Sequence, residues 1–317
     1  MKFTEERLKQ FAAPLSDTEN SKCLHAIKEI RDALKDLGYY SKSDEVSPIE
    51  TDTYSYSVTL NRAYSNEEIQ IFVQGSYANN TCVRGDSDVD IAIVRRDQFE
   101  YAFGKPFILV NPEKQAEGKL FKNIVEVVLR EHFPYAVTRK NKSIRVDGNT
   151  YRKQADTVPC FAIHYFSDWY DRNDHSSFFE GITIYADDGQ IIVNYPKQHI
   201  ANGKKKNVST NYYYKKMVRI IKKMRYLMED YSIPSASGVS SFGLESLLWN
   251  LPDSIFMKYS LYRFEFDEIV DYLVDNKRLL SIYKEANGIK PLCPSSTEVT
   301  KYSRFIDDLR AFYQYDI

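Results

Sequence analysis

The sequence has few of the residues that stabilise small secreted proteins or anchor a chain in a membrane. Four of its 317 residues are cysteine (Cys23, Cys82, Cys160 and Cys293), and no two of them form a Cys-x-x-Cys pair. We therefore expect reduced thiols and no zinc site. The sequence has no run of about 18 apolar residues, which excludes a membrane-spanning helix. The polar start of the chain also lacks the apolar region of a signal peptide, so we expect a cytoplasmic location.

An excess of charge of one sign is also missing, because 43 lysines and arginines stand against 44 aspartates and glutamates. No global field attracts nucleic acid, so affinity for phosphate has to come from a local basic patch, and we expect no stable nucleic-acid partner. The hydrophobic content of 43% and charged content of 27% are typical of a globular protein. The length suits one large domain or two closely joined ones.

Apolar periodicity divides the chain into a mixed first part, residues 1–208, and a helical second part, residues 209–317. No low-complexity linker separates the two parts, so we expect them to share an interface with a cleft. The spacing of apolar residues and turn residues predicts these elements: helices over 17–38 and 117–131; strands over 53–60, 68–73, 88–94, 143–147 and 151–158; a hairpin of 181–186 and 190–194; and helices over 210–230, 241–250, 253–260, 265–276, 277–287 and 297–313.

The most informative stretch runs from Gln74 to Val94. It reads as a strand, a Gly75-Ser76 turn, a short helix and a second strand that begins with Asp88 and Asp90. Residues two apart on a strand leave the same face of the sheet, so the two carboxylates lie side by side and favour a bound cation such as Mg²⁺. The backbone N–H groups of the Gly-Ser turn suit a phosphate group. A metal site beside a phosphate site predicts nucleotide chemistry.

A third carboxylate strengthens this interpretation. Asp156 stands on a separate strand-like segment, and three aspartates from two adjacent strands can coordinate two Mg²⁺ ions, with Mn²⁺ as a substitute. Asp86 precedes the strand and suits a turn or cap better. An EF-hand loop is excluded because Ile91 occupies the position that needs glycine. An isolated Asp-x-Asp pair is more often a solvated loop, but the glycine-serine turn upstream favours a metal site.

With these residues assembled, the chain resembles the DNA polymerase β-like nucleotidyltransferases. More narrowly it resembles the bacterial CD-NTases, the cGAS/DncV-like cyclic-oligonucleotide synthases of anti-phage CBASS systems, and within them clade E. The narrower resemblance is carried by three stretches: residues 155–161, residues 194–199 with Asn211 and the basic helix after it, and residues 240–252. It implies an α+β fold, in which a mixed twisted sheet with helices is joined to a C-terminal helical bundle and the active site lies between the two. The long helix from 210 would be the spine helix of the family.

The resemblance also implies roles for individual residues. Asp88, Asp90 and Asp156 would be the catalytic metal ligands. Thr157 and His164 depart from the family pattern, which could alter the base that is accepted. The donor nucleotide would be held by residues of the turn and of the helical part: Gln74, Gly75, Ser76, Tyr77, Lys222 (with Arg219 and Lys223 as substitutes), Ser241 and Phe242.

Two of these implied assignments have a simpler interpretation. The stripe formed by Lys215, Arg219 and Lys222 faces away from the apolar side of its helix, as an ordinary solvated face does. Phe242 is assigned to stacking on the donor base, but it could equally be a core aromatic. Lys204, Lys205 and Lys206 read as a solvated loop.

The implied reaction joins nucleoside triphosphates (ATP or GTP, UTP, CTP) into a cyclic di- or trinucleotide and releases pyrophosphate. The product would be read by a separate effector, and we expect the synthase to be a monomer. A related transferase that modifies a drug, a tRNA or a protein remains an alternative, as does a catalytically silent nucleotide-binding protein. The three clustered aspartates argue against the silent protein.

Overall fold

The computed structural model of the chain describes residues 2–41, 43, 45–51, 53–84, 88–166 and 178–315. The chain forms two compact units. A sheet unit comprises Ser16–Asn79 and Ser87–Ile200, and a helical unit comprises Met1–Leu15, Asn80–Asp86 and Ala201–Ile317. This division differs from the predicted boundary after residue 208, because the first 15 residues and the segment from Asn80 group with the helices.

The described residues of the sheet unit form a 10-stranded mixed sheet whose main path runs β11-β10-β9-β6-β5-β4-β2. Strands β6 and β9 run parallel to each other, whereas their outer neighbours β5 and β10 run antiparallel to them. The short strand β8 pairs with the start of β9, and β7 pairs with β8. The strands of this sheet are β2 (Tyr39–Ser41), β3 (Ser47–Pro48), β4 (Tyr56–Arg62), β5 (Glu68–Gln74), β6 (Val89–Phe103), β7 (Val137–Arg139), β8 (Ile144–Val146), β9 (Ala155–Phe166), β10 (Phe179–Tyr185) and β11 (Ile191–Asn194).

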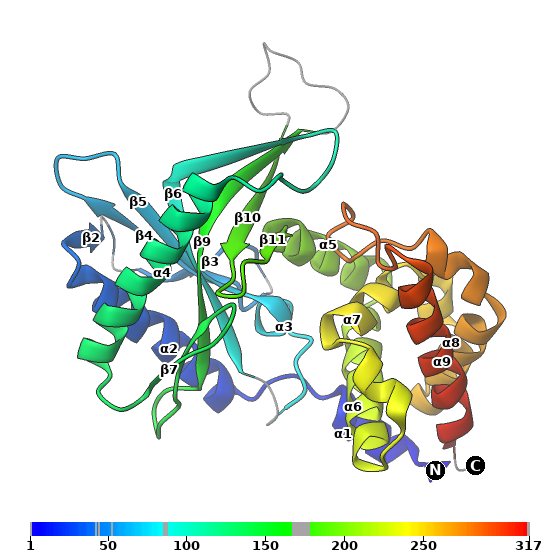
Figure 1. Cartoon of the computed structure of the whole chain (residues 1–317). Helices are drawn as coiled ribbons and strands as arrows, with labels where there is room; N and C mark the ends of the chain where they lie inside the picture. The colour runs from blue at the N-terminus through cyan, green and yellow to red at the C-terminus, as the bar shows by residue number, and fades with distance from the viewer. Residues whose placement is uncertain are drawn as a thin grey trace. The chain divides into compact units, whose positions relative to one another are not determined.

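Two long helices, α2 (Asp17–Lys35) and α4 (Pro112–His132), pack against the sheet and against each other (Figure 1). Helix α2 begins with a capping box: the Ser16 hydroxyl accepts from the Glu19 N–H, and the Glu19 carboxylate accepts from the Ser16 N–H. Such a box satisfies N–H groups that the first turn leaves without partners. Helix α3 (Gly75–Ala78) is a single turn between β5 and the segment leading to β6.

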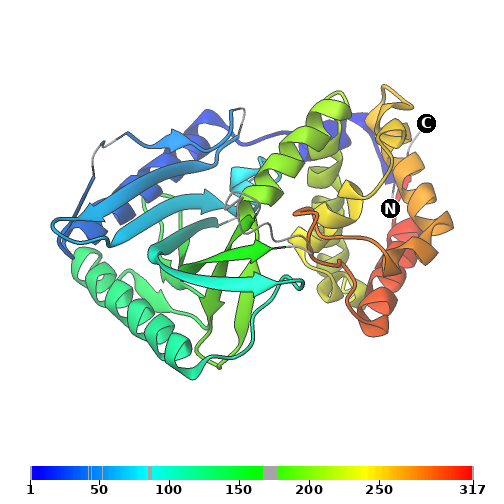
Figure 2. The same ribbon diagram turned by 90° about the horizontal axis from the view of Figure 1, so that it is seen from above.

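The helical unit is built around α6 (Tyr214–Asp230), which packs against α1 (Glu5–Ala12), α7 (Ser241–Trp249) and α9 (Ser296–Phe312). Figure 2 shows this part of the chain as helices throughout most of its length, with both chain ends in it. The ends pair directly, since β1 (Lys2–Phe3) runs parallel to β12 (Gln314–Tyr315). The remaining elements are α5 (Pro196–Ser209), α8 (Tyr262–Asp275) and the 3-10 turns η1 (Pro234–Gly238), η2 (Asp253–Met257) and η3 (Lys277–Ser281).

Most predicted elements are present, but several predictions were wrong in detail. Strand β6 continues nine residues past the predicted end at Val94, to Phe103. Residues 277–287 form only the short turn η3, not a full helix. Lys204, Lys205 and Lys206 lie on α5 and not in a loop. Neither α1 nor α5 was predicted.

None of the helices in the described part of the chain is both long and apolar enough to cross a membrane.

Candidate active site

Two of the three predicted aspartates stand next to each other on neighbouring strands. Asp90 on β6 and Asp156 on β9 are register partners in the parallel pair. Partners in register point to the same face of a sheet, and neighbouring strands lie about 4.8 Å apart. Asp88 precedes β6, two residues before Asp90, so the strand geometry predicted from the sequence brings the three carboxylates to one region. Asp86 lies outside the described residues.

Positively charged side chains compensate these carboxylates. The Lys140 ammonium lies 3.0 and 2.9 Å from the two carboxylate oxygens of Asp156. Arg145, the register partner of Asp156 on β8, lies 3.7 Å from both Asp88 and Asp156. The amide of Gln154 also donates to Asp88 at 2.7 Å. Arg145 thus lies within ion-pair distance of two of the carboxylates.

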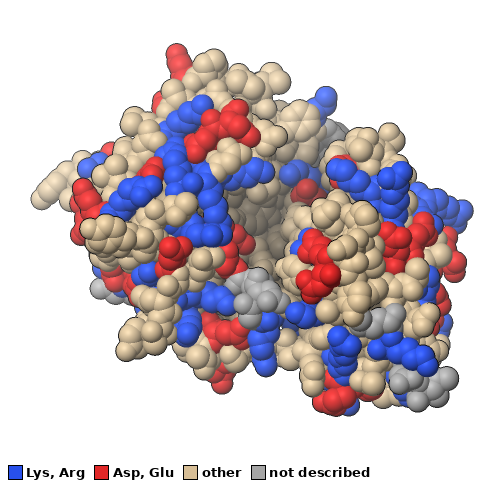
Figure 3. Space-filling view, turned by 60° about the horizontal axis from the view of Figure 1, so that its bottom comes forward, with Lys and Arg blue, Asp and Glu red and all other residues tan. Residues whose placement is uncertain are grey.

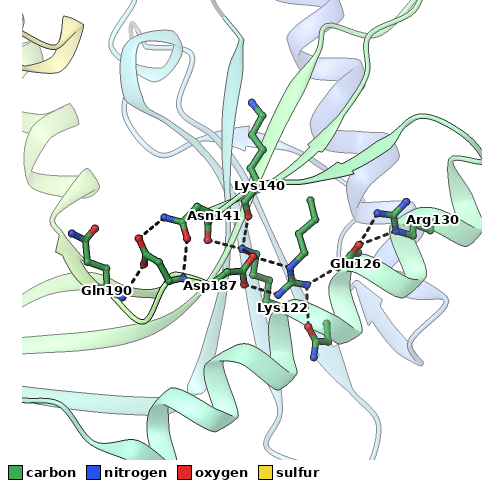
Figure 4. Close-up of polar contacts among 10 residues, drawn as sticks. Lys122, Glu126, Arg130, Lys140, Asn141, Asp187 and Gln190 are labelled. Carbon is green, nitrogen blue, oxygen red and sulfur yellow. Dashed lines mark hydrogen bonds and ion pairs between the residues drawn. The ribbon is translucent and has the colours of Figure 1, made fainter.

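The turn that carries Lys140 is anchored by a buried lysine on α4 (Figure 4). Lys122 is 1% exposed, and its ammonium donates to the carbonyl oxygens of Lys140 and Asn141 at 2.7 and 2.8 Å and to Asp187 at 3.0 Å. Arg139 forms a two-pronged pair with the same Asp187 carboxylate. These contacts fix the β7–β8 turn next to Asp156.

The electrostatics of this network follow from burial and pairing. Removal from water lowers the pKa of Lys122, partly offset by its hydrogen bond to Asp187. The hydrogen bond from Arg139, followed by the one from Lys122, lowers the pKa of Asp187 despite partial burial. The two hydrogen bonds keep Asp187 ionised at neutral pH, so it acts as the anion that pairs with Arg139 and Lys122.

The glycine of the Gly-Ser turn lies against the aspartates. Gly75 has φ +69, a backbone conformation that side chains with a Cβ rarely adopt. A Cβ built on Gly75 would lie 2.6 Å from Oδ2 of Asp90. The sequence predicted that glycine was needed to let a phosphate approach. The structure shows another reason for the glycine, because a side chain at position 75 would collide with the Asp90 carboxylate.

The other turn residues differ in what they can offer a ligand. Gln74 pairs in register with Asp90, and Ser76 is partly exposed. The Tyr77 side chain is buried in the core, so only its backbone can face a nucleotide. Phosphate binding by this turn stays a prediction.

The donor set of three carboxylates has the hard oxygen chemistry that Mg²⁺ prefers. Within the described ranges, however, no group of three or more His, Cys, Asp or Glu side chains is arranged to hold a metal ion. Lys140 pairs with Asp156, and Arg145 lies within ion-pair distance of Asp88 and Asp156. The chemistry and the shared face fit a metal site, but ligation requires the side chains to move away from these cations.

The basic stripe on α6 is not the solvated face that the sequence suggested. Lys215, Arg219 and Lys222 are all buried. Arg219 donates to the carbonyl oxygens of Ala12 and Asn80. Helix α6 is therefore covered on both faces, and this prediction was wrong because a second set of elements packs on the charged side.

Lys222 belongs to a buried network that ties two helices to the segment after α3. The Lys222 and Glu245 side chains are 2% and 1% exposed and lie 2.9 Å apart. Lys222 also donates to the backbone and hydroxyl oxygens of Thr81, and the Thr81 hydroxyl donates to Glu245 at 2.6 Å. Direct nucleotide binding by Lys222 or Arg219 therefore stays a prediction that requires both head groups to exchange partners.

The remaining residues predicted to bind nucleotide are more accessible. Ser241 opens α7 with its hydroxyl 3.4 Å from that of Tyr226, after the N-cap Ser240. Phe242 is 37% exposed, so the alternative of a core aromatic is wrong. Lys223 is partly exposed on α6.

The two departures from the family pattern have structural roles. The buried Thr157 hydroxyl donates to the Ile144 carbonyl at 2.8 Å, which attaches β8 to β9. His164 stacks on Phe178 with ring centroids 3.8 Å apart, and burial lowers its pKa. His164 lies eight residues beyond Asp156 on β9, which is about 26 Å along an extended strand.

The cations and the buried partners around the site were not predicted from the sequence: Lys122, Arg139, Lys140, Arg145, Asp187, Glu245 and Thr81. Glu245 lies within the stretch 240–252 that resembles the family, and Thr81 lies within the stretch Gln74–Val94, but neither was singled out. The other residues look like ordinary surface residues in the sequence, and helix α4, the β7–β8 turn and the pairing of β8 with β9 bring them together.

Comparison with known proteins agrees with this geometry. A family model described as a nucleotidyltransferase domain matches residues 59–156, which include all three aspartates. A second, the cGAS/DncV-like nucleotidyltransferase C-terminal helical domain, matches residues 201–314. The fold and the site therefore define a nucleotidyltransferase with a mixed sheet core and a C-terminal helical domain.

Individual relatives indicate a narrower class of nucleotidyltransferase. The chain is 43% identical over 321 aligned residues to cyclic GMP-AMP synthase CdnE03 of Staphylococcus schleiferi, covering 99% of this chain and 98% of the relative. The structure of the Elizabethkingia meningoseptica CdnE cyclic dinucleotide synthase, solved with GTP and Apcpp, matches with a TM-score of 0.74 and 30% identity over 98% of this chain and 99% of that one. The Rhodothermus marinus CdnE c-UMP-AMP synthase matches with a TM-score of 0.70 and 26% identity over 97% and 96%.

The chain belongs to the cGAS/DncV-like nucleotidyltransferases, the CD-NTases, and within them to the CdnE cyclic nucleotide synthases. The predicted family, the α+β fold class and the enzyme class are confirmed. Nucleotidyl transfer in this family is metal-dependent.

Proposed function

We propose that the chain joins two purine nucleoside triphosphates into a cyclic dinucleotide, with Asp88, Asp90 and Asp156 holding two Mg²⁺ ions. The observation that supports this most is the register pairing of Asp90 with Asp156, with Gly75 packed against Asp90. The choice of purines rests on the relative at 43% identity, a cyclic GMP-AMP synthase.

The strands supply the positioning on which this chemistry depends. Adjacent parallel strands hold Asp90 and Asp156 side by side with little freedom of the backbone, so no large rearrangement of the main chain is needed. When bound, the metal ions would activate the 3′ or 2′ hydroxyl of the acceptor and neutralise the leaving pyrophosphate. Mn²⁺ can substitute in such oxygen sites.

The donor triphosphate would bind at the Gly75-Ser76 turn. Ser76 is partly exposed, and its hydroxyl can donate to a phosphate oxygen at the start of the short helix α3. Lys140 and Arg145, which compensate the aspartates here, supply positive charge for phosphate oxygens once their carboxylate partners bind metal. Ser241, Phe242 and Lys223 on the helical unit are the accessible candidates for further nucleotide contacts.

The wider role follows from the family. A cyclic product would act as a signal for a separate effector in anti-phage defence, with the synthase itself acting as a soluble monomer in the cytoplasm. No residue of the described chain is assigned to the effector.

The test is incubation with ATP, GTP and Mg²⁺ without any acceptor, followed by mass spectrometry of phosphatase-resistant products. We expect a cyclic purine dinucleotide, and a loss of at least about 100-fold in rate for Asp90→Asn, because the amide is a poor metal ligand. Asp36→Asn, at a carboxylate 61% exposed in the same unit, is the matched control and should keep full activity.

Two results would count against the proposal. Full activity in Asp90→Asn would remove the metal assignment. A cyclic product formed from CTP and UTP, but not from ATP and GTP, would leave the enzyme class intact and remove the choice of purines.

A further inference from the structure

Two cations of the β7–β8 hairpin lie on the carboxylates of the candidate metal site. The Lys140 ammonium donates to both carboxylate oxygens of Asp156, and Arg145 lies 3.7 Å from Asp88 and from Asp156. All four residues belong to the sheet unit. The two side chains bring two positive charges to carboxylates that would otherwise repel each other. A single Mg²⁺ ion brings the same charge and binds the same kind of oxygen, so the cations and a metal ion compete for these carboxylates.

Ion pairs are common on this protein, so pairing alone does not indicate a function. On the face shown in Figure 3, lysine and arginine side chains are interspersed with aspartate and glutamate side chains. Lys140 and Arg145 are of interest because both pair with Asp156. Asp156 is the register partner of Asp90 on the neighbouring strand. A change at either cation therefore acts directly on the candidate metal ligands.

The backbone that carries the two cations is held in place. Within the turn the Lys140 N–H donates to the Ser143 carbonyl at 2.9 Å, and the buried Lys122 ammonium donates to the Lys140 carbonyl at 2.7 Å. Figure 4 shows the Lys140 side chain directed away from the network around Lys122. Arg145 stands on β8, which pairs with β7 on one side and with β9 on the other. Because lysine and arginine have long, rotatable side chains, the head groups can change partners while the main chain keeps its place.

Solvent exposure makes these pairs exchangeable. The side chains of Lys140 and Arg145 are each 33% exposed, and the contact of Arg145 Nε with Asp156 is too long for a hydrogen bond. Ion pairs that water reaches contribute little to stability, because solvent screens the charges. The pair of Lys222 and Glu245 is fully buried, and separating it would leave a charge without compensation in the core. The pairs at Asp156 carry no such penalty.

We propose that Lys140 and Arg145 pair with Asp156 and Asp88 until a nucleotide binds and then transfer to its triphosphate, so that divalent ion and nucleotide favour each other's binding. This inference rests on the function proposed above. A metal ion that binds alone displaces cations that are then left without an anion, whereas a metal ion that binds with a nucleotide leaves them phosphate oxygens. Such coupling is reciprocal. The site therefore binds metal weakly until substrate is present.

The test measures Mn²⁺ binding to the full chain without nucleotide, from the loss of the electron paramagnetic resonance signal of the free ion. Lys140→Met removes a competing charge and should tighten Mn²⁺ binding by at least ~5-fold. The same variant should raise KM for ATP by at least ~10-fold, because the triphosphate loses a charge-assisted hydrogen-bond donor. A merely structural role for Lys140 would weaken both kinds of binding, so the opposite directions identify the exchange of partners.

Three further variants serve as controls. Lys142→Met, at an exposed lysine of the same turn, changes the net charge equally and should keep Mn²⁺ affinity within ~2-fold. Lys140→Arg keeps the positive charge and should keep the weak Mn²⁺ binding of the unchanged chain. Adding Asp156→Asn to Lys140→Met should remove the gain in Mn²⁺ affinity, because the gain depends on this carboxylate.

Three results would overturn the inference. The first is unchanged or weaker Mn²⁺ binding in Lys140→Met, and the second is an equal gain in Lys142→Met, which would indicate a general field. The third is an unchanged KM for ATP in Lys140→Met, which would remove the transfer to the triphosphate. Each of them leaves the proposed function intact if the unchanged chain forms the cyclic product. A chain that neither binds Mn²⁺ nor forms product would instead count against the proposed function, and against this inference with it.

Discussion

At the scale of single residues, Gly75 and Asp90 constrain each other. The positive φ of Gly75 turns the chain at the end of β5, and the missing Cβ leaves the space that Oδ2 of Asp90 uses. Any other residue at position 75 would be strained and would also push the carboxylate away. The geometry of the candidate metal site therefore depends on a residue with no side chain.

Gly75→Ala should abolish synthesis while leaving most of the fold intact. The left-handed backbone costs an alanine about 1–2 kcal/mol, and the Cβ at 2.6 Å forces Asp90 to shift. We expect the rate of synthesis to fall by at least ~100-fold, because a displacement of about 1 Å at a reacting group is enough for such a loss. The free energy of unfolding should fall by about the cost of the backbone strain and no more. Gly189→Ala is the control for strain without a clash, because this glycine also has a positive φ and its Cβ would lie 3.6 Å from the Gln115 side chain, an ordinary contact. Equal loss of activity in both variants would contradict the role of the clash.

The alternation around Asp88 and Asp90 predicts that both carboxylates leave one face, and the structure places Asp90 on β6 and Asp88 just before it. The pairing of Asp156 with Arg145 and of Lys140 with Asp156 could not be predicted, since it depends on which strands become neighbours. Nothing in the sequence indicates that a surface-type lysine in a turn will pair with a candidate metal-binding carboxylate.

At the scale of elements, helix α6 shows where apolar periodicity fails. Its apolar residues mark one buried face correctly, but the opposite stripe is buried too, against α1 and the segment after α3. A sequence does not distinguish a buried lysine or arginine from a solvated one when the partner is a backbone carbonyl group or a carboxylate far along the chain. Arg219 is an example of the first case and Lys222 of the second. Helix α5 was missed for a related reason: its glycine and three consecutive lysines weaken any amphipathic pattern.

The β7–β8 hairpin depends on one side chain of α4. Lys122→Met should remove three hydrogen bonds to the turn and to Asp187, and should destabilise the chain by about 2–4 kcal/mol. It should also speed hydrogen exchange in the turn and lower activity by displacing Lys140. Unfolding by urea and exchange mass spectrometry measure these effects. The control is Lys119→Met, at a partly exposed lysine on the same helix. Unchanged exchange at the turn would show that Lys122 does not hold it.

At the scale of the whole molecule, the sequence predicted the two-part organisation but not how the chain is shared between the parts. The 1–208 boundary assumed that each part is continuous. In the structure, two separate pieces from the first 86 residues belong to the helical unit. An apolar pattern predicts which residues are buried, but not which distant segment they pack against. The sequence therefore does not predict that separate pieces of the chain join the same unit.

The stability of the molecule should depend on one buried carboxyl group of the helical unit. Burial, more than the nearby Glu268, raises the pKa of Glu265 on α8 from 4.5 to about 7. Between these values the unfolded chain has released the proton and the folded chain still holds it, so stability falls as pH rises from 4.5 to about 7 and then levels. The total change is about 3 kcal/mol.

Glu265→Gln should remove that slope, because the amide does not titrate and can still accept from the Tyr259 N–H. Urea unfolding at a series of pH values measures this, with Glu6→Gln at an exposed glutamate of the same unit as the control that keeps the slope. A persistent slope in Glu265→Gln would assign the pH dependence to another group.

The parallel pairing of Lys2–Phe3 with Gln314–Tyr315 has a consequence for synthesis on the ribosome. The strand Lys2–Phe3 cannot find its neighbour until residues 314–315 have been translated. The sheet unit, by contrast, has all its strands once residue 194 has appeared. During translation, β1 and α1 therefore remain without their later partners, and the apolar side chains of Phe3 and Leu8 stay uncovered while the strands of the sheet unit can already pair.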